Sequence, residues 1–206
     1  MAQLRDKTAV RRLTPTKNPT KDWTVHKPDL KEDFHGHCAY CFSLDEYRHT
    51  FFEVDHFIPK TFFEPLGNIT VTDYRNLVYA CKFCNNKKLA IWPSKSETVY
   101  HNGKEGFIDP CTDEIENHLY RTDDGGIMWK TELGKWIFNT LNFDERQDVI
   151  KVIWNLKRLG ELIKQLTKVM IKYPETSKDY QELRLKIGQY MTEYFWRHQE
   201  LIGFYQ

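Results

Sequence analysis

Hydrophobic positions come in short runs over the first half of the chain and follow a helical period over the second half. A short helix is predicted at residues 29–34, ending near Gly36, and β-branched and aromatic runs predict strands at 51–55 and 76–80. Residues 85–91 suit a helix that stops before Trp92-Pro93. This half of the chain therefore indicates a small mixed unit of strands and short helices.

Glycine-rich residues 94–130 predict loops with short strands, and from Phe143 onward the pattern becomes helical. Pro174 separates two long helices whose apolar stripes indicate core packing. The stripes are Val152, Leu156, Leu159, Ile163, Leu166 and Met170, then Tyr180, Leu183, Ile187, Tyr190 and Tyr194. We therefore expect an α+β fold with three parts: a basic extended arm at 1–27, a mixed domain at 28–142 with its core at 35–92, and a helical region at 143–206.

Composition narrows the class of protein. The 206 residues are 40% hydrophobic and carry 30 basic against 29 acidic side chains, a net charge of +1. This balance disfavours a histone-like binder or an acidic tail protein. No apolar run approaches the roughly 20 residues that a membrane span needs, and mean hydropathy is −0.65. The charged N-terminus lacks the apolar stretch of a signal peptide, so we expect a cytoplasmic protein.

Charge is nevertheless uneven along the chain. Residues 1–31 hold eight Lys or Arg against three Asp and are interrupted by Pro15, Pro19 and Pro28. This pattern predicts an extended arm, which is either a solvated tail or a segment that contacts a polyanion.

Cysteines carry the first chemical signal. Four of the five form two Cys-x-x-Cys pairs, Cys38 with Cys41 and Cys81 with Cys84, while Cys111 stands alone and is expected to be a free thiol. An odd count without a secretion signal argues against a disulfide framework. Two pairs of identical spacing favour a structural zinc site with four thiolates over ordinary buried or redox-active cysteines.

The residues between the two pairs supply what metal-assisted phosphodiester cleavage needs. Asp55 offers a hard oxygen for Mg²⁺ or Mn²⁺, and His56 offers a base that can activate water near neutral pH. Adjacent strand residues face opposite sides, so we expect the strand to bend where these two share a site. Asn85 offers an amide oxygen as a second metal ligand. Four lysines are candidates for nucleic-acid contact: Lys60, Lys82, Lys87 and Lys88.

Each of these residues also has an ordinary structural interpretation. An Asp-His pair is commonly a surface hydrogen-bonded pair, Asn85 stands where a helix cap is expected, and Asn76 could be a turn residue. The competing functional hypothesis is a zinc-stabilised nucleic-acid-binding module without catalysis. A further alternative is an interaction scaffold that has lost its activity. The combined pattern favours catalysis.

The composite pattern over residues 35–92 closely resembles the HNH endonuclease family, whose zinc-stabilised ββα-metal nuclease core it implies here. The matching residues are Cys38-x-x-Cys41, Asp55-His56-x-Ile58-Pro59, Asn76-Leu77 and Cys81-x-x-Cys84-Asn85-x-x-Lys88. The resemblance implies that His56 is the general base and Asp55 a ligand of the catalytic metal. It also implies that Asn76 ties down the loop between the strands and helps orient His56. Asn85 takes the third family position, which is His in many members, and this sequence is thus an H-N-N variant.

A second resemblance covers more of the chain and concerns PtuB-type HNH proteins. It rests on Phe107-Ile108-Asp109-Pro110, residues 116–118, Asp124-Gly125-Gly126-Ile127 and Leu141-Asn142. Such proteins are effectors of Septu and retron-linked anti-phage systems and are paired with an ATPase. The resemblance implies a nuclease that acts on nucleic acid, DNA above all, and a helical region after Phe143 that docks a partner.

Overall fold

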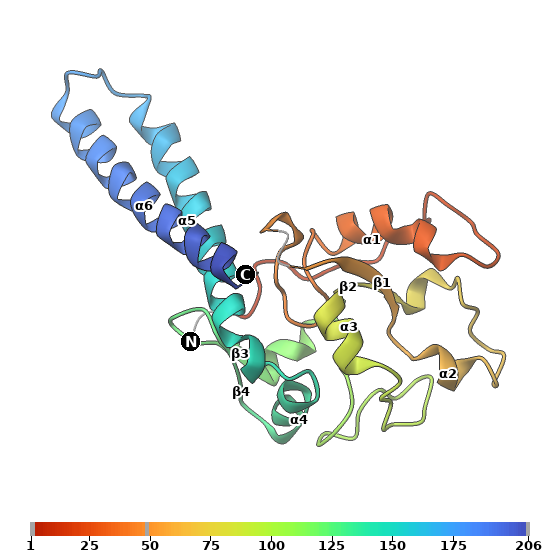
Figure 1. The fold of residues 1–206 in the computed structure, drawn as a ribbon. Coiled ribbons are helices and arrows are strands. Elements are labelled where there is room, and N and C mark those ends of the chain that lie inside the picture. The colour runs from red at the N-terminus through yellow and green to blue at the C-terminus, as the bar shows by residue number, and fades with distance from the viewer. Residues whose placement is uncertain (1–2, 48–49, 205–206) are drawn as a thin grey trace. The chain divides into compact units, whose positions relative to one another are not determined.

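We describe the protein from a computed structural model, and the description is confined to residues 3–47 and 50–204. The chain divides into two compact units, Met1–Gln147 and Asp148–Gln206, and each is described by itself. Figure 1 shows the mixed unit with its short elements and the second unit with its two long helices.

The first unit contains two small antiparallel sheets, one pairing β1 with β2 and the other pairing β3 with β4. The α+β class expected from the sequence is confirmed. The elements are η1 (Trp23–His26), α1 (Lys27–Asp33), η2 (Asp45–Tyr47), β1 (Phe52–His56), α2 (Lys60–Phe63), η3 (Tyr74–Asn76), β2 (Leu77–Cys81), α3 (Lys82–Lys88), η4 (Asp113–Asn117), β3 (Leu119–Arg121), β4 (Ile127–Trp129), α4 (Glu132–Thr140) and η5 (Asp144–Arg146).

The β1–β2 pair followed by α3 is the ββα unit expected from the sequence. Its register places Asp55 opposite Val78 and His56 opposite Leu77. All five residues of β2 are buried, because α1 and α3 both contact this strand, which explains its uninterrupted apolar sequence. Helix α3 begins at Lys82, earlier than the predicted start at residue 85, and Cys81 occupies the N-cap position. Asn85 therefore lies inside the helix and does not cap it.

From residue 3 on, the N-terminal arm has no helix or strand before η1, and part of it packs into the first unit, to which it belongs. Leu4 is fully buried and Arg5 is 5% exposed. Arg12 forms ion pairs with Asp29 and Asp33, at 2.9 and 2.8 Å. These pairs hold Arg12 against α1, so its charge serves packing of the arm.

Helix α4 lies between the predicted loops at 94–130 and the helical pattern expected from Phe143, in a stretch to which the sequence assigned no element. Thr131 caps the helix by accepting a hydrogen bond from the Gly134 backbone N–H. The glycine lowers helix propensity, yet its position requires it: a Cβ there would lie 2.0 Å from the backbone oxygen of His118. The close approach of two backbones therefore explains the glycine.

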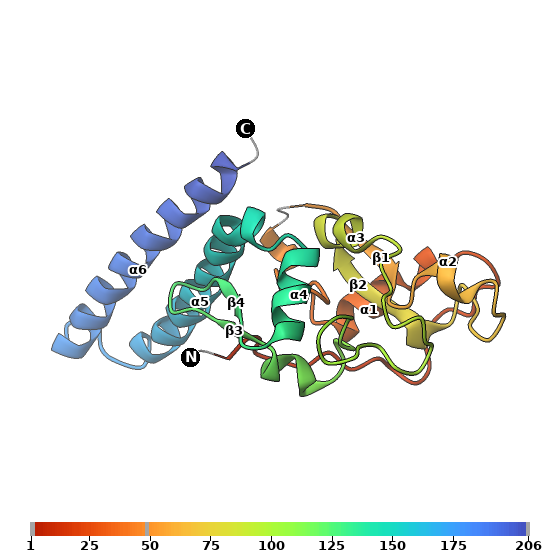
Figure 2. The same ribbon diagram turned by 90° about the horizontal axis from the view of Figure 1, so that it is seen from below.

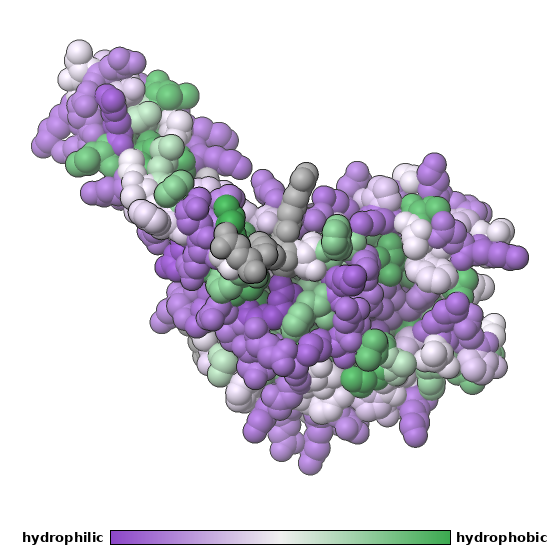
Figure 3. All heavy atoms as spheres, in the orientation of Figure 1, coloured by the Kyte–Doolittle hydropathy of each residue, from purple (hydrophilic) through white to green (hydrophobic). Residues whose placement is uncertain are grey.

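The second unit consists of α5 (Gln147–Met170), which begins at the last residue of the first unit, and α6 (Lys178–Gly203). The two helices run antiparallel on either side of the turn that contains Pro174 (Figures 1 and 2). Figure 3 shows apolar side chains exposed among charged ones on this unit; Leu185 and Trp196 are 68% and 65% exposed. Within the described residues, no helix combines the length and apolarity that crossing a membrane requires.

Candidate active site

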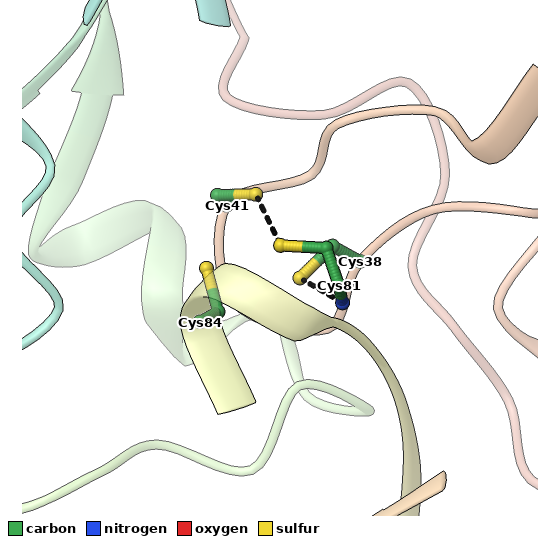
Figure 4. A group of neighbouring side chains, drawn as sticks. All are labelled: Cys38, Cys41, Cys81 and Cys84. Carbon is green, nitrogen blue, oxygen red and sulfur yellow. Dashed lines mark hydrogen bonds between the residues drawn. The ribbon is translucent and has the colours of Figure 1, made fainter. Parts of the chain in front are cut away.

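Four cysteines from distant parts of the chain converge on one buried point (Figure 4). Cys38 and Cys41 lie in the loop after α1, Cys81 ends β2, and Cys84 lies in the first turn of α3. Their sulfur atoms all lie within 4.8 Å of one another. The Cys41 and Cys81 sulfurs are 3.8 Å apart, close to the roughly 3.8 Å that tetrahedral geometry with 2.3 Å zinc–sulfur bonds requires. The donor set therefore fits a tetrahedral Zn²⁺.

The surroundings of the sulfurs supply hydrogen-bond donors. The backbone N–H of Cys81 donates to Cys38 Sγ at 3.3 Å, and Arg146 Nη1 donates to Cys81 Sγ at 3.3 Å. Burial raises the pKa of the Cys38 and Cys84 thiols, so a bound cation is what would hold them as thiolates. Arg146 comes from η5, far along the chain, and no motif pointed to it. Cys111, half-exposed, is not a member of this cluster.

Asp55 and His56 are adjacent residues of β1, whose side chains alternate between the faces of the strand, and they have different partners. Tyr40 Oη donates to Asp55 Oδ2 at 2.6 Å, and Lys88 Nζ lies 3.3 Å from the same oxygen. The ring of His56 packs between Trp23 and Phe63, with centroids 5.0 and 5.4 Å away. Strand β1 ends at His56, so both side chains lie at the strand terminus.

The tautomer of His56 follows from one contact. Its Nε2 lies 2.8 Å from the carbonyl oxygen of Val71, and because a carbonyl only accepts, Nε2 carries the proton and Nδ1 keeps its lone pair. Burial lowers the pKa of His56 below its ordinary value of 6.5, although Val71 and Asp55 oppose the shift. His56 is therefore a neutral imidazole near pH 7, with Nδ1 able to accept a proton.

Asn76 ties the segment after β1 to the start of β2. Its Oδ1 accepts from the Ile58 N–H at 2.8 Å and its Nδ2 donates to the Ile58 carbonyl at 3.0 Å. Its own backbone carbonyl accepts from the N–H of Phe57 at 2.8 Å. Asn76 is 4% exposed, so these bonds are shielded from water and fix the chain that directly follows His56.

Asn85 projects from α3 toward β1, where its Nδ2 donates to Glu53 Oε2 at 2.9 Å. Lys88, one turn later on α3, was expected to contact phosphate. Its side chain is fully buried, so this expectation is wrong. Its ammonium donates to the carbonyl oxygen of His56 at 2.8 Å and pairs with Asp55. Lys88 therefore fixes both residues of the Asp-His pair from inside the protein, a role that only its burial reveals.

The other three predicted lysines remain accessible to solvent. Lys82 is exposed and Lys60 and Lys87 are half-exposed. Lys87 Nζ pairs with Glu145 at 3.1 Å. Lys60 Nζ lies 5.1 Å from the ring centre of Trp23, the indole that packs on His56. Trp23 and Glu53 were not singled out in the sequence, because a lone aromatic residue in an arm and an acid in a strand carry no motif.

Part of the chain is similar to known proteins. Residues 38–90 match the family model described as HNH endonuclease. The Septu protein PtuB of Bacillus thuringiensis is 32% identical to this chain over 90 residues, which cover 44% of the chain and 30% of the relative. The match thus spans less than a third of that relative's length. No solved structure matches the chain.

Proposed function

From the match of residues 38–90 to the HNH endonuclease family model, we propose that this protein hydrolyses phosphodiester bonds of nucleic acid with the help of a divalent metal ion. The observation that carries the proposal is the state of His56. Its Nε2 is fixed by Val71, its pKa is lowered by burial, and its Nδ1 keeps the lone pair that a general base needs. A module that only binds nucleic acid has no need of a base in this form.

Each residue of the site has a distinct task in this proposal. Asp55 and Asn85 offer the carboxylate and amide oxygens that would hold Mg²⁺ or Mn²⁺. The chemistry that such an ion would supply when bound is polarisation of the scissile phosphate and stabilisation of the leaving oxygen. His56 Nδ1 takes the proton from the attacking water. Asn76 and Lys88 hold the backbone at the base and just after it, through their bonds to Ile58 and His56.

The four cysteines would hold Zn²⁺ in a structural role. Four thiolates complete a tetrahedral site and leave no open position for a substrate. The cluster joins the loop before β1 to the β2–α3 junction, so zinc would keep Asn85 and Lys88 in register with β1. We propose Lys60, Lys82 and Lys87, the accessible lysines of the predicted set, as phosphate contacts.

DNA is the proposed substrate, and the protein would act in the cytoplasm as the effector of an anti-phage defence system. The likeness to a Septu protein supports this assignment. The net charge of +1 predicts weak affinity for nucleic acid by the protein alone. Recruitment by a partner would compensate, and we propose an ATPase that docks on the helical region after Phe143.

The test is cleavage of supercoiled plasmid and of a structured RNA by the zinc-loaded protein, with Mg²⁺, Mn²⁺ or a chelator of divalent ions present. We expect metal-dependent nicking of the plasmid, lost progressively as salt is raised. Cleavage of RNA alone would overturn the DNA assignment. Binding of either nucleic acid without any product, also after addition of the proposed ATPase, would favour a binding module over a nuclease.

A further inference from the structure

Strand β1 and helix α3 are joined by two parallel side-chain contacts. Glu53 and Asp55, two residues apart, share one face of the strand, while Asn85 and Lys88, three residues apart, share one face of the helix. Glu53 Oε2 accepts from Asn85 Nδ2 at 2.9 Å, and Asp55 Oδ2 lies 3.3 Å from Lys88 Nζ. The two proposed metal ligands, Asp55 and Asn85, therefore belong to neighbouring contacts, each with its own partner.

The contact with Glu53 decides which end of the Asn85 amide is free. A carboxylate can only accept hydrogen bonds, so Nδ2 and not Oδ1 must face Glu53. The amide group is planar with its oxygen and nitrogen on opposite sides, and Oδ1 is consequently directed away from Glu53. Without this partner the amide could turn over and present its N–H₂ group, which repels a cation.

We propose that Glu53 is a positioning residue that orients the amide of Asn85 so that Oδ1 is presented to the divalent ion. This inference rests on the proposed function and deepens it. It assigns a task to an acid that is absent from the predicted site, and it explains how an asparagine can take the ligand position. Glu53 acts through Asn85 and does not itself bind the ion.

A double-mutant cycle on Mn²⁺ affinity tests the inference. Mn²⁺ binding to the full-length, zinc-loaded protein would be followed by electron paramagnetic resonance for the parent, Glu53→Ala, Asn85→Ala and the double variant. We expect about tenfold weaker binding for Glu53→Ala, as for the loss of other partners that orient metal ligands, and binding at least as weak for Asn85→Ala, which loses the ligand itself. The double variant should bind no more weakly than Asn85→Ala, because Glu53 has nothing left to orient.

Two further variants make the test specific. Glu53→Gln retains an oxygen that accepts from Asn85 Nδ2, so its Mn²⁺ affinity should stay within about threefold of the parent's; it also serves if Glu53→Ala fails to retain zinc. Glu97→Ala is the matched control, because Glu97 Oε2 accepts from Asn68 Nδ2 at 2.8 Å. It removes the same kind of contact and should leave Mn²⁺ affinity unchanged.

The outcomes separate this inference from the proposed function. A double variant that binds Mn²⁺ more weakly than Asn85→Ala, or a Glu53→Gln variant as weak as Glu53→Ala, would mean that Glu53 is a ligand or acts by its charge, and would overturn the inference. Equal affinity of the parent and Asn85→Ala would overturn it as well. A protein that follows the expected cycle but cleaves no nucleic acid would instead refute the proposed function.

Discussion

Replacing Asn76 by alanine should destabilise the first unit by an amount that the structure sets. The substitution removes two hydrogen bonds, to the N–H and to the carbonyl of Ile58. Ile58 is 3% exposed, so water does not replace the lost partners. A buried polar group left unpaired costs about 1–3 kcal/mol, and two such groups that relax in part should cost about 2–4 kcal/mol in total.

Urea unfolding at saturating zinc would measure this loss, with Asn86→Ala as the control. Asn86 is exposed on α3, where alanine is tolerated or slightly favourable, so the control should keep the parent's unfolding free energy. Where Asn76→Ala is still folded, its cleavage rate should fall by up to about 100-fold, because the chain that follows His56 is no longer held. A destabilisation below about 0.5 kcal/mol would refute the reasoning that these two bonds fix the segment.

Three other changes have defined outcomes. Lys88→Met leaves Asp55 without its buried cation and should cost about 3–5 kcal/mol in urea unfolding; unchanged stability would contradict the ion pair. Because burial depresses the pKa of His56 below 6.5, cleavage should rise with pH, with its midpoint below 6.5, and then level off. The stability that His56 contributes should be present above pH 6.5 and fall as the pH drops through its lowered folded-state pKa, whereas a His56→Gln variant should lack this component. Cys84→Ser should reduce zinc content and abolish cooperative unfolding of the first unit, and retention of both would exclude a four-cysteine site.

The elements that were predicted correctly are those whose pattern is local. The runs at 51–55 and 76–80 lie within one residue of β1 and β2, because both strands are bounded by residues that end them. Each Cys-x-x-Cys pair brings two sulfurs together in a tight turn, and the presence of two such pairs predicted one zinc site that all four share. In the same way, the spacing of apolar residues after Phe143 was sufficient to predict α5 and α6.

What could not be predicted depends on contacts between distant residues. From the sequence, Lys88 was a candidate for phosphate contact. Only the packing of α3 on β1 shows that its ammonium is buried. Arg12 looks like a free cation until the arm lies against Asp29 and Asp33. Gly134 weakens the helical pattern of α4, and the glycine is required because the neighbouring backbone of His118 leaves no room for a Cβ.

The central claim is that His56 is the general base of a metal-dependent nuclease. The most direct test compares plasmid cleavage in Mg²⁺ or Mn²⁺ by the parent, His56→Ala and His198→Ala, whose substituted side chain is exposed on α6. The account predicts that His56→Ala loses cleavage while its zinc content and far-ultraviolet circular dichroism match the parent, and that His198→Ala cleaves normally. A His56→Ala variant that cleaves as fast as the parent would contradict the account.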